Sequence, residues 1–227
     1  MRGCFITGTD TGVGKSVISA SLTRALRGIG HDAVAIKPIE TGCAGEPSDG
    51  ALLMAASGNS EPIEAIVPLT FREPLAPMVA ASLEGRTIEP RELVSKVRAT
   101  ASRHEFAIVE GAGGLLVPIT KRYFMRDLMR DLELPVLIVA SVRLGTLNHT
   151  LMTIECARNA GLSVAVVVLN ENVPPDGGIA ERTNPDVLRS LTDLPVIGPF
   201  PYMREPAQST SFDFSALLAA LGISGRR

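Results

Sequence analysis

A glycine-rich segment near the amino terminus combines residue types and spacing that could bind phosphate. The segment GTDTGVGKS, residues 8–16, follows a short apolar run and leads into a helical pattern. Glycines there let successive backbone N–H groups point at phosphate oxygens, and the helix N-terminus adds its positive end. Lys15 would neutralise the outer phosphates, and the Ser16 hydroxyl would bind Mg²⁺. A plain glycine-rich turn is the alternative, since Thr9 replaces a glycine of the strict pattern, but the strand-to-helix position favours a phosphate loop.

Two further charged residues close apolar runs of strand length. Lys37 ends the run 33–37, and Glu110 ends the run that begins at Phe106. In a parallel α/β sheet the carboxyl ends of the strands share one edge, where ligands bind. An acidic residue after a buried strand commonly serves a magnesium ion, so Glu110 is a candidate metal ligand. We expect Lys37 near the phosphate loop, with a merely solvated strand-end lysine as the alternative.

The loops after these strands supply further candidates. Thr41 lies in the expected loop after Lys37, and Asp49 lies in a second expected loop, 44–50. Asp49 could bind the metal or could only cap the helix expected over 51–56, because Asp is a preferred capping residue. Glycines after Glu110 remove side chains, so that the backbone there could approach a ligand closely.

Apolar runs alternate with helical patterns along the whole chain. The expected strands cover 4–7, 33–37, 106–109, 136–140, 164–169 and 195–197, and the clearest helices cover 15–27, 90–103, 146–160 and 181–191. The strand runs are apolar throughout and rich in Val and Ile, as in parallel strands buried on both faces. These patterns predict an α/β fold with a doubly wound, mostly parallel sheet flanked by helices, as in P-loop NTPases. The segment 172–178 is a loop by composition, either nucleotide-contacting or a simple turn.

Length and composition limit the remaining possibilities. The 227 residues favour one domain, 1–227, with 222–227 as a frayed tail. A net charge of −2 and 4% aromatic residues argue against nucleic-acid binding. Three widely spaced cysteines argue against a disulfide framework, and no apolar run reaches membrane-spanning length, so we expect a cytoplasmic protein with no membrane partner. The three histidines lack metal-ligand spacing, and we expect them at the surface or in loops.

Several motifs taken together resemble the dethiobiotin synthase family. They are GTDT at 8–11, VGKS at 13–16, KP with TG within 37–42, SD at 48–49 and VEGAGG at 109–114. Similar stretches at 144–149 and 201–205 extend the likeness over most of the chain, from residue 3 to residue 206. The phosphate loop alone is weakly specific, whereas its combination with Lys37 and with the glycine run after Glu110 is strongly specific.

The resemblance implies an ATP- and Mg²⁺-dependent enzyme that carboxylates 7,8-diaminopelargonate with carbon dioxide. In that reaction carbon dioxide adds to one amine, the carbamate takes the γ-phosphate, and the second amine closes the ureido ring of dethiobiotin. Lys37 falls on the family's catalytic lysine, Lys15 assists it on the phosphates, and Thr41 falls on the substrate-contacting position. The resemblance also implies a homodimer, because the family's diamine site draws on both subunits.

The family's metal and nucleotide positions carry over residue by residue. The metal ligands fall on Ser16, Asp49 and Glu110. The nucleotide contacts, including adenine contacts, fall on Thr11, Gly12, Val13, Gly14, Lys15, Ser16, Val17, Asp49, Glu110, Gly111, Ala112, Gly113, Asn170, Gly198, Pro199, Phe200 and Glu205. Gly12 stands where some members carry Glu, so we assign it a backbone N–H role alone. Nucleotide preference is not fixed by these residues.

Two other classes share parts of this pattern. ParA- or MinD-like partner-binding ATPases carry a lysine five places before the phosphate-loop lysine, where this chain has Asp10, and an acid cannot neutralise phosphate. Cobyrinate-type amide ligases take ammonia from a glutaminase domain. The chain offers no plausible glutaminase nucleophile, since Cys156 lies within a helical pattern and is expected in the core.

Overall fold

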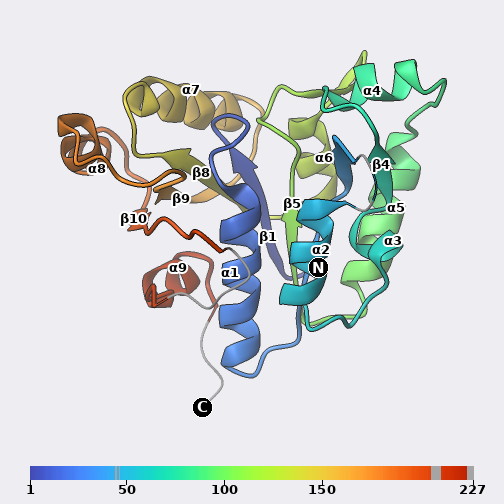
Figure 1. Ribbon diagram of the computed structural model, residues 1–227, viewed down its shortest axis with the longest axis horizontal. Coiled ribbons are helices and arrows are strands. Elements are labelled where there is room, and N and C mark those ends of the chain that lie inside the picture. Colours follow the sequence, from blue (N-terminus) through green and yellow to red (C-terminus); the bar gives the residue numbers. More distant parts are fainter. Residues whose placement is uncertain (44, 46, 206–210, 224–227) are drawn as a thin grey trace.

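The central feature of the fold is one parallel sheet of six strands. The computed structural model describes residues 1–43, 45, 47–205 and 211–223 (Figure 1). The strand order is β10-β9-β8-β1-β5-β2, and every pairing in this sheet is parallel. The strands are β1 (Gly3–Gly8), β2 (Ala33–Ile36), β5 (Phe106–Glu110), β8 (Val136–Ser141), β9 (Val164–Asn170) and β10 (Val196–Phe200). The predicted α/β class with a mostly parallel sheet is confirmed.

Burial explains why these runs form the centre of the sheet. The strands β1, β2 and β5 are buried along nearly their whole length, because helices cover both faces. β1 lies between β5 and β8: the chain first places β2 and β5 on one side of β1, and then β8, β9 and β10 on the other. Right-handed crossovers then place helices on both faces, and the reversal at β1 creates the position where ligands bind in such sheets.

The helices follow the sequence patterns closely where those patterns are long. They are α1 (Lys15–Gly28), α2 (Ser48–Ala56), α3 (Ile63–Ile66), α4 (Pro77–Leu83), α5 (Pro90–Ala101), α6 (Met125–Leu132), α7 (Thr146–Asn159), α8 (Ile179–Leu191) and α9 (Ser215–Ala220). Figure 1 shows α1 in front of the central strands with α2 beside it, and these two helices contact each other. No helix in the described part of the chain has both the length and the apolar composition to cross a membrane.

Two short strand pairs were not predicted. β3 (Ile39–Thr41) pairs in parallel with β4 (Leu69–Phe71), and β6 (Pro118–Thr120) pairs in antiparallel with β7 (Tyr123–Phe124). Thr41, expected in a loop, is therefore the last residue of β3. Strands of two or three residues are too short to produce a periodic signal in the sequence.

The prediction of a loop over 44–50 is wrong at the carboxyl end of that range. Helix α2 begins at Ser48, so Asp49 lies in its first turn rather than in a loop. The capping alternative for Asp49 is also wrong, because Pro47 occupies the N-cap position and no side chain there caps the helix. Instead, both oxygens of Glu40 accept hydrogen bonds from the N–H groups of Asp49 and Gly50, at 3.0 Å and 2.8 Å.

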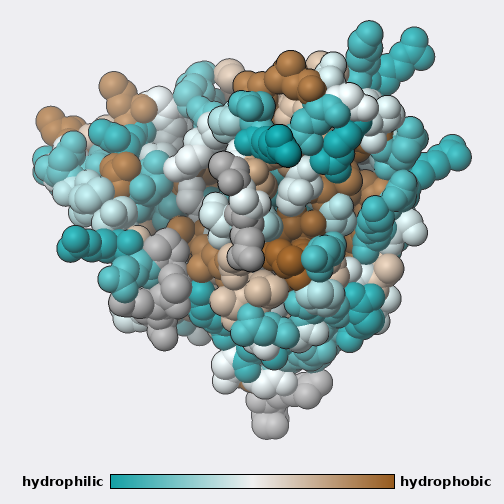
Figure 2. Space-filling view, turned by 45° about the vertical axis from the view of Figure 1, so that its right-hand side comes forward, coloured by the Kyte–Doolittle hydropathy of each residue, from teal (hydrophilic) through white to brown (hydrophobic). Residues whose placement is uncertain are grey.

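The surface and the carboxyl-terminal segment complete the fold. In Figure 2 hydrophilic residues surround smaller apolar areas on the face shown. Of the tail expected to fray, Gly222 and Ile223 are described, and Ile223 is buried, whereas residues 224–227 lie outside the described part of the chain. The single-domain assignment stays a prediction.

Candidate active site

The loop between β1 and α1 forms one side of a cavity of about 330 Å³. Gly14 in this loop has a φ of 92°, and a Cβ atom there would lie 2.1 Å from the Asn170 amide nitrogen. Glycine is therefore required at this position, both for the left-handed backbone and for the close approach. The cavity is lined by Thr11, Gly12, Gly14, Lys15, Ser16, Val17, Lys37, Glu40, Thr41, Asp49, Glu110, Ala112 and Gly113. The structure thus brings together most of the residues predicted from the sequence.

Lys37 is the buried charge at the centre of this cavity. Its Nζ donates to Glu110 Oε1 at 2.8 Å and also to Asp49 Oδ2. Burial alone would lower the pKa of Lys37, but the carboxylates of Glu110 and Asp49 outweigh it and raise the pKa above its ordinary value. Lys37 is thus held as a cation, and the solvated alternative is wrong because only 6% of the residue is exposed.

Lys15 faces the same cavity with fewer partners. Its Nζ donates to the main-chain carbonyl of Asp10 at 3.0 Å. Burial lowers the pKa of Lys15 from its ordinary value, with Glu110 opposing that effect and Lys37 adding to it. The two lysines place positive charge beside a glycine-rich loop and a helix N-terminus, which together favour a polyanionic ligand.

The donor set fits a magnesium ion. Ser16 Oγ donates to Glu110 Oε1 at 2.7 Å, and Glu110 Oε2 is buried without a hydrogen-bond partner among the described residues. No cluster of three or more His, Cys, Asp or Glu side chains that could hold a metal is found in that same part of the chain. Such a cluster is not required, because Mg²⁺ beside a nucleotide takes one or two carboxylates and completes its shell with phosphate oxygens and water. An orphan buried carboxylate oxygen next to a hydroxyl suits that arrangement.

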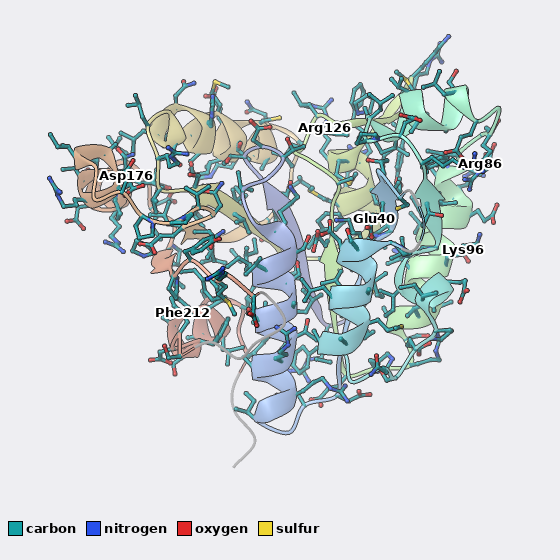
Figure 3. The ribbon with its side chains drawn as sticks, in the orientation of Figure 1. Glu40, Arg86, Lys96, Arg126, Asp176 and Phe212 are labelled. Atoms are coloured by element: carbon teal, nitrogen blue, oxygen red, sulfur yellow. The ribbon has the colours of Figure 1, made fainter. Side chains whose placement is uncertain are left out.

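Glu40 is a site residue that sequence reasoning missed. It is 4% exposed, and its two hydrogen bonds to the first turn of α2 fix where Asp49 stands relative to Lys37. Figure 3 labels Glu40 beside α2, in the middle of the molecule. No local sequence signal reveals it, since a carboxylate that caps a helix normally lies within that helix's own first residues.

The expected adenine contacts lie outside the cavity lining. Gly198, Pro199 and Phe200 belong to β10, next to β9, and Phe200 pairs with Asn170 in the sheet. The Phe200 side chain is fully buried, with its ring centroid 4.9 Å from that of Phe212 and 6.1 Å from that of Phe214. Any contact of Phe200 with a base would therefore use the main chain. Glu205 is exposed, and its assignment stays a prediction.

The remaining nucleotide-binding candidates divide by burial. Val13 is buried beneath the loop, and a Cβ at Gly111 would lie 2.8 Å from the Phe5 ring, so close packing requires glycine there. Ala112 and Gly113 line the cavity. Asn170, 2% exposed, donates to the Val13 carbonyl rather than pointing at open space.

The fold and the site define a P-loop nucleotide-binding protein. The strand order of the parallel sheet changes direction at β1, a glycine-rich loop leads into α1, and two buried lysines face the cavity. Comparisons with known proteins agree. A family model described as an AAA domain matches residues 2–210. Two solved structures share the fold: the septum site-determining protein MinD of Pyrococcus horikoshii, complexed with Mg-ADP, and a ParA family ATPase of Chlorobium tepidum. The MinD structure is 17% identical in sequence with a TM-score of 0.59, and the match covers 91% of this chain and 84% of the MinD chain. The ParA family ATPase is 15% identical with a TM-score of 0.55, and the match covers 97% of this chain and 91% of the ATPase chain. This likeness shows the fold alone.

Curated relatives narrow the class. The ATP-dependent dethiobiotin synthetase BioD of Anaeromyxobacter dehalogenans is 53% identical over 78% of this chain and 79% of its own. The protein of the same name from Thermodesulfovibrio yellowstonii is 37% identical over 96% of this chain and 98% of its own. That from Bacillus licheniformis is 42% identical over 90% of this chain and 88% of its own. The chain belongs to the ATP-dependent dethiobiotin synthetase family. The resemblance seen in the motifs is confirmed, and the ParA- or MinD-like proteins are related to the chain only distantly, through their structure.

Proposed function

We propose that this protein is an ATP-dependent cyclo-ligase that forms dethiobiotin from 7,8-diaminopelargonate and carbon dioxide in biotin biosynthesis. One amine of the diamine adds carbon dioxide to give a carbamate, and a carbamate oxygen takes the γ-phosphoryl group of ATP, releasing ADP. The second amine then attacks the carbon of this mixed anhydride, phosphate leaves, and the ring closes. The observation that carries the proposal is the buried Lys37 ammonium, held between Glu110 and Asp49 in the same cavity as the phosphate loop.

Charge is the main problem that this chemistry poses to the protein. The carbamate and the triphosphate are both anions and repel each other unless cations lie between them. Lys15 and Lys37 both line the cavity and supply that charge, Lys15 from the phosphate loop and Lys37 from the end of β2. Because phosphoryl transfer needs mainly positioning and neutralisation of oxygen charge, two fixed ammonium groups lower the barrier without forming a covalent bond.

Ser16, Asp49 and Glu110 would hold magnesium in this proposal. The ion, when bound, neutralises charge on the β- and γ-phosphate oxygens. The unpartnered Glu110 Oε2 and the adjacent Ser16 hydroxyl support the assignment. Lys37 donates to both carboxylates, so the metal would compete with Lys37 for their oxygens, and the nucleotide phosphates would compete with the carboxylates for the Lys37 ammonium.

The diamine would lie near Thr41. Thr41 lines the cavity and ends β3, so its main chain is held by the pairing with β4. For the nucleotide base we retain Asn170, residues 198–200 and Glu205 as the contacting positions. Their support is the place of β10 beside β9, whose last residue touches the phosphate loop.

We further propose that the protein is a cytoplasmic homodimer. Leu116, Leu144 and Met152 are large apolar side chains that are 55%, 90% and 55% exposed. Leu116 and Met152 line one hollow that also includes Gly8 and Asp10 of the phosphate loop. An apolar surface beside the site suits a second copy of the chain, which would cover it and border the diamine. Sedimentation equilibrium would test this, and a strictly monomeric active enzyme would exclude it.

Release of ADP provides the direct test of the proposed reaction. The purified protein with Mg-ATP should release ADP only when bicarbonate and 7,8-diaminopelargonate are both present. An ATPase that works without either substrate would instead support the partner-binding class. A reaction that requires ammonia or glutamine would support an amide ligase.

A further inference from the structure

The segment that follows β9 reaches back to the phosphate loop through two asparagines. Asn170, the last residue of β9, donates from Nδ2 to the Val13 carbonyl at 2.8 Å. Asn172 donates from Nδ2 to the Gly12 carbonyl at 3.0 Å. The two residues are two positions apart in the sequence, on the same side of an extended chain, and their side chains donate to two consecutive carbonyls of the loop. None of the catalytic roles assigned above uses Asn172.

The geometry of the peptide bond gives these hydrogen bonds a consequence. In a planar trans peptide the C=O of one residue and the N–H of the next point in opposite directions. A carbonyl of Gly12 that faces Asn172 therefore turns the N–H of Val13 away from it. In the same way, the Val13 carbonyl on Asn170 turns the N–H of Gly14 away. Neither N–H donates to another protein group within the described residues, and Gly14 lines the cavity.

We propose that Asn172, acting with Asn170, is a positioning residue that aims the Val13 and Gly14 N–H groups at the phosphates of the nucleotide. The inference rests on the proposed nucleotide site and adds to it a residue that acts on the ligand only through the loop. Both glycines that flank Val13 have left-handed φ values, 72° and 92°, so the loop needs outside support to keep one conformation. The asparagine amides supply that support from a separate strand.

The competing role for Asn172 is contact with the base. The segment 172–178 leaves that role open on composition alone. In the structure, however, the amide donor of Asn172 is engaged by the loop main chain. Its Oδ1 is buried and has no partner among the described residues, and the proposal gives this oxygen no part. The two roles predict loss of affinity for different parts of ATP, which makes them separable.

The test compares ligands that hold only one part of ATP. Two variants, Asn172→Ala and Asn172→Leu, remove the amide donor, and the second keeps a side chain of similar size. Asn159→Ala serves as the matched control, because Asn159 is an exposed asparagine at the end of α7. Displacement of a fluorescent ATP analogue would give the affinities of magnesium tripolyphosphate and of adenosine for each protein.

The expected result is a selective loss of phosphate binding. Tripolyphosphate should bind both Asn172 variants about 5- to 10-fold more weakly, the scale of one lost hydrogen bond. Adenosine should bind them as it binds the wild type and the Asn159→Ala control. Weaker adenosine with unchanged tripolyphosphate would overturn the proposal in favour of base contact. Equal loss of both ligands, or no change, would overturn it as well. Failure of the wild type itself to bind tripolyphosphate would overturn the nucleotide site and the positioning role together.

Discussion

Charged side chains gather at both edges of the central sheet, and the two groups differ in how completely they are paired. At the amino ends of the strands, Arg103 binds Glu61 through two nitrogens, at 2.7 Å and 2.6 Å, and His104 lies 3.0 Å from both Glu61 and Asp32. Asp32 directly precedes β2. Every one of these groups has a partner within the protein.

The carboxyl ends carry charges that the protein pairs only in part. Lys37 contacts two carboxylates, but Glu110 keeps a buried oxygen without a partner among the described residues, and the Lys15 ammonium binds a main-chain carbonyl. Leaving a buried polar atom unmatched costs stability, and at Glu110 the adjacent Ser16 hydroxyl and the phosphate loop suit a ligand that completes the set. The candidate catalytic end of the sheet, at the carboxyl ends of the strands, thus differs from the amino end in how completely its charged groups are paired, more than in how many charges it carries.

Removing the Lys37 charge should have the largest effect. We expect Lys37→Met to reduce kcat for ring closure by about 10²–10³-fold, because a fixed donor is lost where negative charge develops. Nucleotide binding should persist through Lys15 and the loop. Steady-state kinetics with a parallel thermal melt would separate the catalytic loss from instability caused by the unpaired Glu110. Retention of more than about a tenth of wild-type kcat would show that Lys37 has no such role.

Disturbing Glu40 should have an intermediate effect, because it acts through Asp49. In Glu40→Gln one acceptor is replaced by an amide donor that cannot accept from the N–H groups at the start of α2. We expect kcat/KM to fall about tenfold and the Mg²⁺ concentration for half-maximal rate to rise, as happens when a supporting residue of a metal site is lost. Glu64→Gln, an exposed acid in the first turn of α3, is the control. Unchanged Mg²⁺ dependence would separate Glu40 from the site.

A substitution in the charged network at the amino ends of the strands should leave catalysis intact. We expect Glu61→Gln to lower Tm by ~2–4 °C with kcat unchanged within experimental error, because this network supports only the fold. Loss of activity without loss of stability would break the distinction between the two edges. Circular dichroism melts and the ADP-release assay, run on the same preparation, provide both measurements.

The smallest expected effect is a change with pH in the Tm difference between the wild type and Glu61→Gln. Hydrogen bonds from Arg103 and, secondarily, His104 hold the pKa of Glu61 below its ordinary value. A carboxyl whose folded pKa is depressed adds stability above its unfolded pKa and loses it as the pH falls through the folded value. The Tm difference between wild type and Glu61→Gln should therefore shrink below about pH 4. A difference that grew on acidification would contradict this assignment.

Long apolar runs and the phosphate loop were predictable because they depend on neighbours in the sequence. All six expected strands appear in the sheet, and helix α1 starts at Lys15 as its pattern predicts. Glu40 and Asn172 were not predictable as supports, since each acts on a segment that only tertiary structure brings near. His31 and His104 lie in loops, as expected from the sequence. Their burial was not predictable: His31 and the His104 side chain are each about 6% exposed, because paired acids allow a polar ring to be buried.

Carbon-labelled bicarbonate tests the central claim most directly. The protein would be incubated with Mg-ATP, labelled bicarbonate and 7,8-diaminopelargonate, beside Lys37→Ala, and acid-stable label in dethiobiotin would be measured. The account predicts label that depends on ATP, on the diamine and on Lys37. Label that survives in Lys37→Ala would contradict the role of that lysine, and absence of label from a wild type that binds ATP would contradict the synthase function itself.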